Sequence, residues 1–503
     1  MKKLVFLFLS FTSMTTFAQK AEGLKKFGTI ITQQGLKEKL SIIASAEMEG
    51  RETASPGQKR AAAYIESQFK RMGLLPGNGD SYQQVYPVYK DVLTEKSLTV
   101  NGRSFEWDKD YSFSLQTITS GNYTNVVYAG YGIVDTANGI NDYENLDVQG
   151  KLVLVSEGST SSINWIAGDN RAFNANPASP FAKMRNALAK GAAGLFIISS
   201  DFPKKTATPT TGNIYTKANT AKGFAMINIS KEVGTAILGT TNYTKGSFAT
   251  QVNLVATKTT ENLESSNVVG IIPGTDKKDE YLVLSAHYDH LGKKGDIIWY
   301  GADDDGSGTV SVMQMAEAFA AAAKKGQSPR RNIVFIIVSG EEKGLLGSDY
   351  YSEHPIFPLD KTTADLNTDM VGRVDTERLT ADSLNYLYVI GHDKLSTDLP
   401  IINEAANNQS SKLVLDYKFD DPADKQRIYY RSDHYNFAKK GVPVLFFYDG
   451  MLLADYHKPT DTIEKINFDL MQRRVLMIYY TAAEIANRDE MLKRDLKLNM
   501  PGR

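Results

Sequence analysis

Four nearly uninterrupted apolar runs in the C-terminal half of the chain most constrain its fold. They are YLVLSA (281–286), NIVFIIV (332–338), NYLYVIG (385–391) and VPVLFF (442–447). A strand covered by helices on both faces is apolar throughout, whereas a half-exposed strand alternates between apolar and polar residues. Apolar residues at helical spacing predict helices at Val310–Lys324 and near Met471–Asn487. The sequence therefore predicts an α/β domain with a mainly parallel-centred mixed sheet flanked by helices.

The 503 residues are too many for one ordinary hydrophobic core, so we expect several domains. The N-terminus has two lysines, a short apolar stretch and small residues before Gln19, which is typical of a secretory signal peptide. A helix pattern follows Pro56-Gly57, and the region 80–113 is predicted to form short strands with turns. The predicted order is a signal peptide (1–18), a first catalytic segment (23–114), an inserted module (115–257) and a second catalytic segment (258–495).

Composition excludes several classes of protein. The hydrophobic content of 42% and charged content of 23% are those of a soluble globular chain. With 57 basic and 58 acidic residues and no basic stripe, we predict no nucleic-acid partner. The apolar stretch at the N-terminus is too short to span a bilayer and no later segment is long enough, so we expect an exported, periplasmic or secreted protein with no membrane span. The absence of cysteine excludes a thiol nucleophile and a cysteine-ligated zinc.

Histidine and carboxylate side chains follow the ends of several predicted strands. Sites in open α/β sheets form beyond the carboxyl ends of the strands, so loops that are distant in sequence are expected to converge there. Two imidazoles, three ligand carboxylates and one spare carboxylate are the inventory of a two-metal hydrolytic site. The candidate residues are His287, Asp304 within GADDDGSG (301–308), Glu341, Glu342, Asp369 and His457.

The motifs HYDHLG, GADDDGSG, GEEKGLLGS, NTDMVGR, RSDHYNF and DYHKPTDT occur in an order that resembles the M28 family of zinc metallopeptidases. That family includes aminopeptidases, some carboxypeptidases and glutamate carboxypeptidase. The segment 47–76 resembles the opening of such catalytic domains, and 115–257 resembles a protease-associated (PA) domain. The resemblance covers nearly all of the chain after the predicted signal peptide. It implies the zinc exopeptidase fold with an inserted β-rich PA-like domain.

The resemblance also implies two Zn²⁺ per chain, and Co²⁺ or Mn²⁺ would fit the same nitrogen and oxygen donors. His287 and Asp369 would hold one ion, Glu342 and His457 the other, and Asp304 would bridge the two. Each ion then has one imidazole, one private carboxylate and one shared carboxylate, which leaves room for water.

Two further residues receive catalytic roles. Glu341 matches the general base, which would accept a proton from the water between the ions and pass it to the leaving amine. Asp289, two residues after His287, is predicted to accept the other N–H of that imidazole.

Other residues of these motifs have competing interpretations. Asp303 and Asp305 are predicted to lie in a solvated turn, and His290, His354 and His392 to be structural or exposed. Asp433 and His434 either support the ligands or belong to the polar core. Asp461 either orients His457 or caps a helix, and Tyr448 and Tyr456 either donate to the oxyanion, line the pocket or pack in the core.

The predicted function is an exported di-metal exopeptidase acting on peptide substrates, with aminopeptidase action through a metal-bridged hydroxide as the leading hypothesis. A carboxypeptidase, a glutaminyl-cyclase-like enzyme with one zinc and a non-catalytic binding protein are the alternatives. A complete ligand set argues against the last two. The inserted module is expected to restrict access to short peptides. The clamped peptide terminus, the side-chain specificity and the oligomeric state stay open.

Overall fold

The computed structural model describes residues 21–115, 118–159, 176–217 and 223–500, and it divides into two compact units. The larger unit contains the chain up to Val88 and from Leu263 onward, and the smaller unit is Tyr89–Asn262. The predicted signal peptide 1–18 lies outside the described residues. Within the described ranges, no helix combines the length and apolar character needed to cross a membrane.

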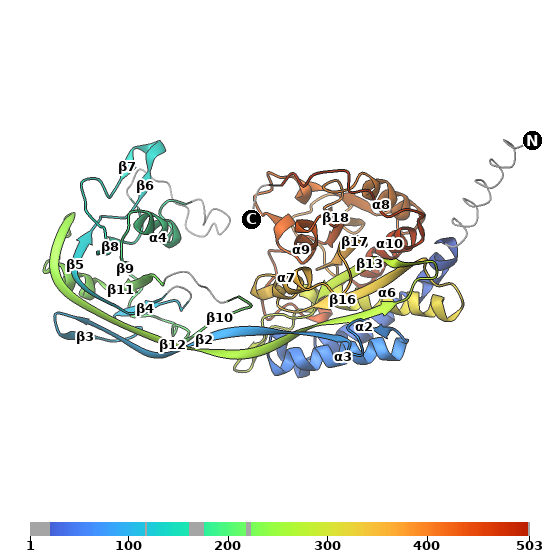
Figure 1. Ribbon diagram of the computed structural model, residues 1–503, viewed down its shortest axis with the longest axis horizontal. Coiled ribbons are helices and arrows are strands. Elements are labelled where there is room, and N and C mark those ends of the chain that lie inside the picture. The colour runs from blue at the N-terminus through green and yellow to red at the C-terminus, as the bar shows by residue number, and fades with distance from the viewer. Residues whose placement is uncertain (1–20, 116–117, 160–175, 218–222, 501–503) are drawn as a thin grey trace, which may run out of the picture. The chain divides into compact units, whose positions relative to one another are not determined.

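The larger unit is built on a mixed sheet with the strand order β19-β18-β20-β17-β13-β16-β12 (Figure 1). The central strand β13 runs parallel to β16 and β17, and β17 runs parallel to β20. Strand β12 is antiparallel to β16, and β18 is antiparallel to β20 but parallel to β19. The predicted parallel-centred mixed sheet is confirmed. Its strands are β12 (Gly246–Ile272), β13 (Lys277–His287), β16 (Arg331–Val338), β17 (Thr362–Thr368), β18 (Tyr386–Ile390), β19 (Val414–Asp416) and β20 (Val444–Tyr448).

Helices cover both faces of this sheet. Along β13, Leu282 and Leu284 belong to one buried apolar cluster, and Val283 between them belongs to a second cluster on the opposite face. Both faces are therefore withdrawn from water, which explains the continuous apolar runs. The first cluster includes side chains of α2 (Gln33–Ile43), α3 (Pro56–Met72), α6 (Gly308–Lys324), α8 (Asp398–Gln409) and α10 (Phe468–Asn487), and the second includes α7 (Leu346–Glu353) and α9 (His434–Lys439).

Local signals fix the ends of helix α3. The Ser55 hydroxyl accepts the backbone N–H of Gln58, and Pro56 occupies the first helical position, where it has no N–H to leave unpaired. Gly73 ends the helix in the left-handed conformation, with φ of 87°. The predicted helix after Pro56-Gly57 is confirmed, with its first turn beginning at Pro56 itself.

The region 80–113 departs from the prediction of short strands. Gln83–Val100 forms one strand of 18 residues, β2, which is followed by β3 (Arg103–Phe105) and β4 (Tyr111–Phe113). Within β2 the charged residues Glu95 and Lys96 are exposed, so the strand continues through a polar stretch.

The smaller unit has the strand order β12-β5-β8-β9-β11-β4, with β5, β8, β9 and β11 parallel. Its bounds are wider than the predicted insert 115–257 because β4 pairs with β11 and β3 pairs with β2. The pattern at 181–198 predicts a helix followed by a strand, as the structure has them in α4 and β9. The elements are β5 (Gly121–Tyr128), β8 (Leu152–Ser156), α4 (Pro180–Ala189), β9 (Gly194–Ile198), β10 (Thr211–Tyr215), β11 (Ala225–Ile229) and α5 (Lys231–Leu238).

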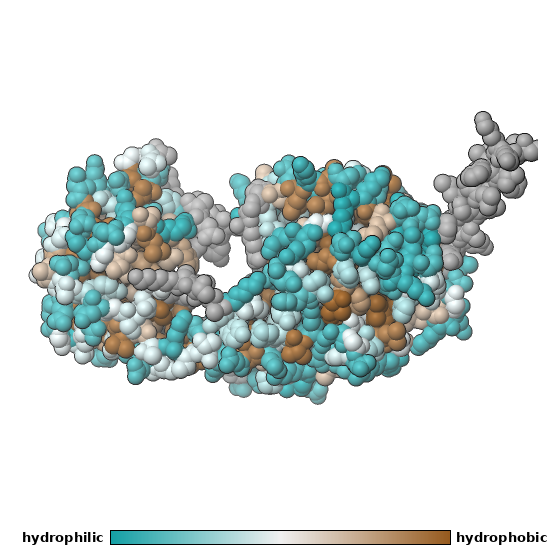
Figure 2. Space-filling view, in the orientation of Figure 1, coloured by the Kyte–Doolittle hydropathy of each residue, from teal (hydrophilic) through white to brown (hydrophobic). Residues whose placement is uncertain are grey.

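Two-residue strands complete the fold as β1 (Leu75–Pro76), β6 (Val134–Asp135), β7 (Ile140–Asn141), β14 (Lys293–Lys294) and β15 (Ile297–Ile298). On the face drawn in Figure 2, hydrophilic residues cover most of the surface, and hydrophobic residues form separate patches between them. This distribution is ordinary for a water-soluble surface, because apolar atoms always contribute part of the exposed area.

A fully buried arginine joins loops that lead to the sheet edge. The Arg51 guanidinium donates to the carbonyl oxygens of Tyr288 at 2.6 Å, Ile43 at 2.8 Å, Tyr300 at 2.7 Å and Gly301 at 2.9 Å. Burial lowers its pKa to about 10. These four carbonyl oxygens lie at the ends of secondary-structure elements or in loops. The Arg51 side chain supplies a hydrogen-bond donor to each of them.

Replacing Arg51 by methionine is expected to reduce the free energy of unfolding of the larger unit by at least about 3 kcal/mol, because four carbonyl oxygens that are buried or partly buried lose their donor. Chemical denaturation of the metal-free protein, followed by circular dichroism, measures this. R60M, on the exposed side of α3, is the control and should have a much smaller effect. Equal losses for R51M and R60M would contradict the role given to Arg51.

Candidate metal centre

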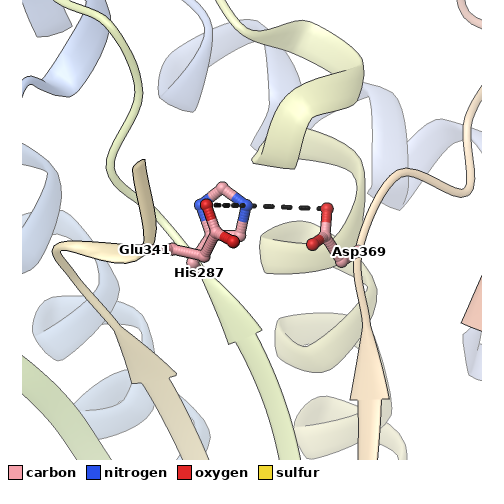
Figure 3. A group of neighbouring side chains, drawn as sticks. All are labelled: His287, Glu341 and Asp369. Carbon is pink, nitrogen blue, oxygen red and sulfur yellow. Dashed lines mark ion pairs between the residues drawn. The ribbon is translucent and has the colours of Figure 1, made fainter. Parts of the chain in front are cut away.

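Three parallel strands bring His287, Glu341 and Asp369 together at one sheet edge. His287 is the last residue of β13, Glu341 follows β16 across two residues, and Asp369 directly follows β17. Figure 3 shows one nitrogen of the His287 imidazole joined by dashed lines to a carboxylate oxygen of Glu341 and to one of Asp369. Its Nε2 lies 3.5 Å from Asp369 Oδ1 and 3.9 Å from Glu341 Oε2. The sequence prediction that separate loops converge beyond the strand ends is realised in this geometry.

Asp304 lies between two imidazoles. Its Oδ1 is 3.4 Å from His287 Nε2, and its Oδ2 is 3.2 Å from His457 Nε2. The two oxygens of one carboxylate therefore face different histidines, which is the arrangement that a carboxylate shared by two ions requires.

Glu342 forms the second half of the cluster. Its Oε2 lies 3.1 Å from His457 Nε2, and its Oε1 lies 2.8 Å from His290 Nδ1. The rings of His290 and His457 meet edge to face, with centroids 5.9 Å apart. The sequence predicts His290 to be structural or exposed, and this prediction missed its place beside Glu342 in the cluster. Its spacing of three residues from His287 is the one sequence signal that could have indicated a shared site.

The donor atoms suit divalent cations. Several of them are buried and have no hydrogen-bond partner among the described residues, namely His287 Nε2, His290 Nδ1, Asp304 Oδ2 and Glu342 Oε1. The 2.8 Å approach of His290 to Glu342 lacks hydrogen-bond geometry. Burying polar atoms without partners is costly, whereas coordination would satisfy them. Two compact groups fit an ion each: His287 with Glu341 and Asp369, and His290 with Asp304 and Glu342.

The electrostatics of the cluster have two physical causes, burial and neighbouring charge. Burial raises the pKa of Glu341 well above its usual range, and the carboxylates of Glu342 and Asp369 add to this against the opposing effect of His287. For Asp304, burial acts in the same direction, but the imidazoles of His287 and His457 outweigh it and hold the pKa well below its usual range. The Glu341 carboxyl group thus favours its protonated form, and the Asp304 carboxyl group favours its anionic form.

Asp289 supports the site through contacts other than the predicted one. Its carboxylate accepts the Thr53 hydroxyl at 2.7 Å and the backbone N–H of Glu341 at 3.1 Å. The Nδ1 of His287 lies 3.1 Å from the Asp289 main-chain carbonyl and 3.7 Å from the carboxylate. The backbone carbonyl therefore orients the imidazole, while the side chain fixes the position of Glu341.

The prediction of a solvated turn for Asp303 and Asp305 is wrong, since both are fully buried. Asp305 accepts backbone N–H groups from Gly308 at 2.8 Å, Met370 at 3.0 Å and His287 at 3.2 Å, so it joins three loops of the site. Asp303 accepts the N–H of Gly372 at 2.9 Å.

Asp461 acts on the Asp304 loop rather than on His457. Its carboxylate accepts the backbone N–H of Asp303 at 3.0 Å and that of Asp304 at 3.1 Å. The Ser432 hydroxyl similarly donates to Asp369 Oδ2 at 2.6 Å. These contacts hold the Asp304 loop and the Asp369 carboxylate in the geometry described above.

Two neighbouring residues of the RSDHYNF motif belong to the buried core. His434 stacks on Phe446 with ring centroids 4.7 Å apart, and burial lowers its pKa to about 3, which keeps it neutral. Asp433 accepts the Ser348 hydroxyl and is fully buried. Both side chains are therefore part of the buried core, and neither is among the residues grouped as possible metal ligands.

A third group, His392 with Asp393 and Asp420, lies after β18. His392 pairs with Asp420, and Lys394 Nζ lies 2.5 Å from Asp393 Oδ1 and 3.6 Å from Asp420 Oδ1. The ammonium group of Lys394 already balances the charge of these carboxylates, so this cluster needs no metal ion. His354 is exposed, as predicted.

A pocket opens onto Asp304, Glu341 and Asp369. Tyr448 and Tyr456, for which lining the pocket was one of the predicted interpretations, both contribute to its wall. The cluster is therefore accessible to a small ligand from one side while its other sides are buried.

Comparison with known families agrees with this architecture. Residues 267–482 match the model of Peptidase family M28, and residues 123–237 match the PA domain. Residues 267–482 therefore form a Peptidase family M28 domain, and the predicted resemblance is confirmed. Its PA domain is inserted between the two segments that build the larger unit, as the motif order predicts.

Several relatives and solved structures resemble the chain. Aminopeptidase YwaD of Bacillus subtilis is 27% identical over 70% of this chain and 66% of its own length, and a probable leucine aminopeptidase of Arthroderma otae is 29% identical over 46% and 60%. The chain thus matches less than two thirds of the length of these relatives. The solved aminopeptidase from Aneurinibacillus sp. strain AM-1 has a TM-score of 0.56 at 20% identity, covering 96% of this chain and 98% of its own. A zinc aminopeptidase from Bacillus subtilis has a TM-score of 0.54 at 22% identity, with coverage of 94% and 99%.

Removing divalent ions with a chelator is expected to lower the melting temperature, because buried carboxylates lose their countercharge. An ion present at a thousandfold excess over its Kd stabilises the folded form by about 4 kcal/mol. Scanning fluorimetry with and without added zinc, together with elemental analysis, measures this.

His457→Ala should reduce the metal content from two ions per chain to about one. His354→Ala, which removes an exposed imidazole, is the control and should retain both ions. If H457A keeps two ions, Glu342 does not need His457, and His290 supplies the nitrogen donor in its place.

Proposed function

We propose that the protein is a metal-dependent exopeptidase, and specifically an aminopeptidase that uses two zinc ions. The observation that carries the proposal is the position of Asp304 between two imidazoles, with Glu341 beside it at the pocket. In this proposal, His287 and Asp369 hold one ion and Glu342 and His457 the other. Asp304 is shared between them.

Bound divalent ions supply Lewis-acid chemistry: they polarise a peptide carbonyl and lower the pKa of water towards about 7. The chain's own residues perform the remaining steps. Glu341 accepts a proton from the attacking water and delivers it to the leaving amine. The Asp289 carboxylate, by accepting the Glu341 backbone N–H at 3.1 Å, keeps this base directed at the pocket.

The environment of Glu341 suits proton transfer. Burial favours its protonated form, so the carboxyl group can hold a proton between the two halves of the reaction. It lines the pocket together with Asp304 and Asp369, at the place where a scissile bond would meet the ions.

Names of related proteins support the peptidase assignment. The relatives described above are an aminopeptidase and a probable leucine aminopeptidase, and a probable lipoprotein aminopeptidase of Mycobacterium tuberculosis is 24% identical over 85% of this chain. The lipoprotein relative, together with the predicted signal peptide 1–18, supports export of this protein to the periplasm or the exterior. We assign catalysis to the larger unit, which corresponds to the predicted segments 23–114 and 258–495 with their inner bounds moved to Val88 and Leu263.

Carboxypeptidase action is the second candidate. A probable glutamate carboxypeptidase of Arabidopsis thaliana is 34% identical over 20% of this chain. The same set of metal ligands can serve either action, because the outcome depends on which peptide terminus the pocket binds.

Glu341→Gln is expected to reduce kcat by about 10²–10⁴-fold while leaving two ions bound, because the amide keeps the shape of the side chain but cannot accept a proton. Initial rates on an aminoacyl anilide and elemental analysis provide the two readouts. An E341Q protein with near wild-type kcat would remove Glu341 from the mechanism.

Peptides blocked at one end distinguish the two actions. We expect chelator-sensitive release of the N-terminal residue from a free or C-amidated peptide and none from its N-acetylated form, because an aminopeptidase site must hold the free amine. Mass spectrometry of the products measures this. The reverse pattern would identify a carboxypeptidase, and no cleavage of any form would favour a non-catalytic binding protein.

A further inference from the structure

The pocket contains one basic side chain opposite its acidic residues. Asp304, Glu341 and Asp369 form one part of the lining, and Arg431 is the single basic residue among the described residues that line it. Arg431 is solvent-exposed, so an entering ligand can reach its guanidinium.

The guanidinium is held in a defined place. Its Nη2 donates to the Tyr456 hydroxyl at 3.0 Å, and the guanidinium carbon lies 5.6 Å from the centroid of the same ring. Tyr456 is itself stacked on His457, with ring centroids 3.8 Å apart. The positive group is therefore attached to the wall of the metal cluster through one aromatic ring, and little side-chain freedom is left to lose on binding.

Arg431 has no ion-pair partner among the described residues, and Tyr456 is its one hydrogen-bonded side chain there. Other arginines of the same unit are paired: Arg373 lies 2.9 Å from Asp455, and Arg378 lies 2.5 Å from Asp382. The remaining donors of the Arg431 guanidinium stay available, and the fork they form matches the two oxygens of a carboxylate.

We propose that Arg431 binds a carboxylate group of the peptide substrate, so that the enzyme selects acidic ligands. This inference rests on the proposed function. Four apolar side chains also line the pocket, namely Met370, Ile428, Phe446 and Leu452. A ligand with an apolar stem and an anionic end matches this lining, since the stem contacts the apolar wall while the anion reaches the guanidinium.

The carboxylate can come from two sources. It can be the side chain of an acidic residue next to the scissile bond, or the C-terminal carboxylate of a short peptide. Both present the same planar pair of oxygens, so the structure assigns the chemical group and an experiment identifies its source.

Two matched substrate pairs test the proposal with the metal-loaded protein. The first pair is a C-amidated peptide with N-terminal glutamate and the same peptide with glutamine. The second pair is a dileucine peptide with a free C-terminus and its amide. For at least one pair, the wild-type kcat/KM should favour the acid by about tenfold or more, the equivalent of about 1.4 kcal/mol.

Arg431→Met should reduce that acid-to-amide ratio at least tenfold, and R431K should give an intermediate ratio because lysine keeps the charge without the planar fork. K440M is the control, since Lys440 pairs with Glu353 outside the pocket, and it should preserve the wild-type ratios. Ratios near one for both wild-type pairs, or ratios that R431M leaves unchanged, would overturn the proposal.

Calorimetric binding of the same pairs to Glu341→Gln separates this inference from the proposed function. A preference for the acid that depends on Arg431, in a protein whose wild type cleaves no peptide, would support the carboxylate site and reject the peptidase. Turnover without any such preference would do the opposite. Circular dichroism of R431M and R431K identifies a folding defect, and R431K alone then decides the ratio.

Discussion

Like charges crowded inside the protein are the constraint on which the rest of this site depends. Asp304, Glu341, Glu342 and Asp369 converge at the edge of one sheet, and all are largely withdrawn from water. Isolated buried carboxylates would be protonated or would unfold their surroundings. The fold balances them with imidazoles, backbone N–H groups and the two divalent ions that we propose.

The parallel sheet explains how so many charged side chains reach the same place. β13, β16 and β17 run parallel, so each delivers its following residue to the same edge. Helices on both faces keep the strands rigid and dry. Asp305, Asp461 and Asp289 then fix the loops by accepting backbone N–H groups, so a single rigid layer sets positions for ligands that are up to 170 residues apart, from His287 to His457.

Sequence reasoning predicts the central part of this architecture because its signals are local. Continuous apolar runs identify β13, β16, β18 and β20, and the order of six motifs indicates the convergence of His287, Asp304, Glu342, Asp369 and His457. Sequence reasoning fails where the environment of a residue is determined by segments that are distant in the sequence. Asp303 and Asp305 look like a polar turn until loops from 368–372 cover them, and His290 acquires its importance only from Glu342 approaching it. The length of β2 is likewise set by pairing with distant strands rather than by its own composition.

The contact between Asp461 and the backbone of Asp303 and Asp304 has a consequence for biosynthesis. During translation the Asp304 loop emerges from the ribosome long before residue 461, and it lacks its anchoring carboxylate until the last segment has been made. A nascent chain that ends before residue 461 therefore lacks this support for the proposed metal centre, even though most of its sheet strands have been made. The support of the Asp304 loop is therefore completed late, when Asp461 contacts a loop that was synthesised more than 150 residues earlier.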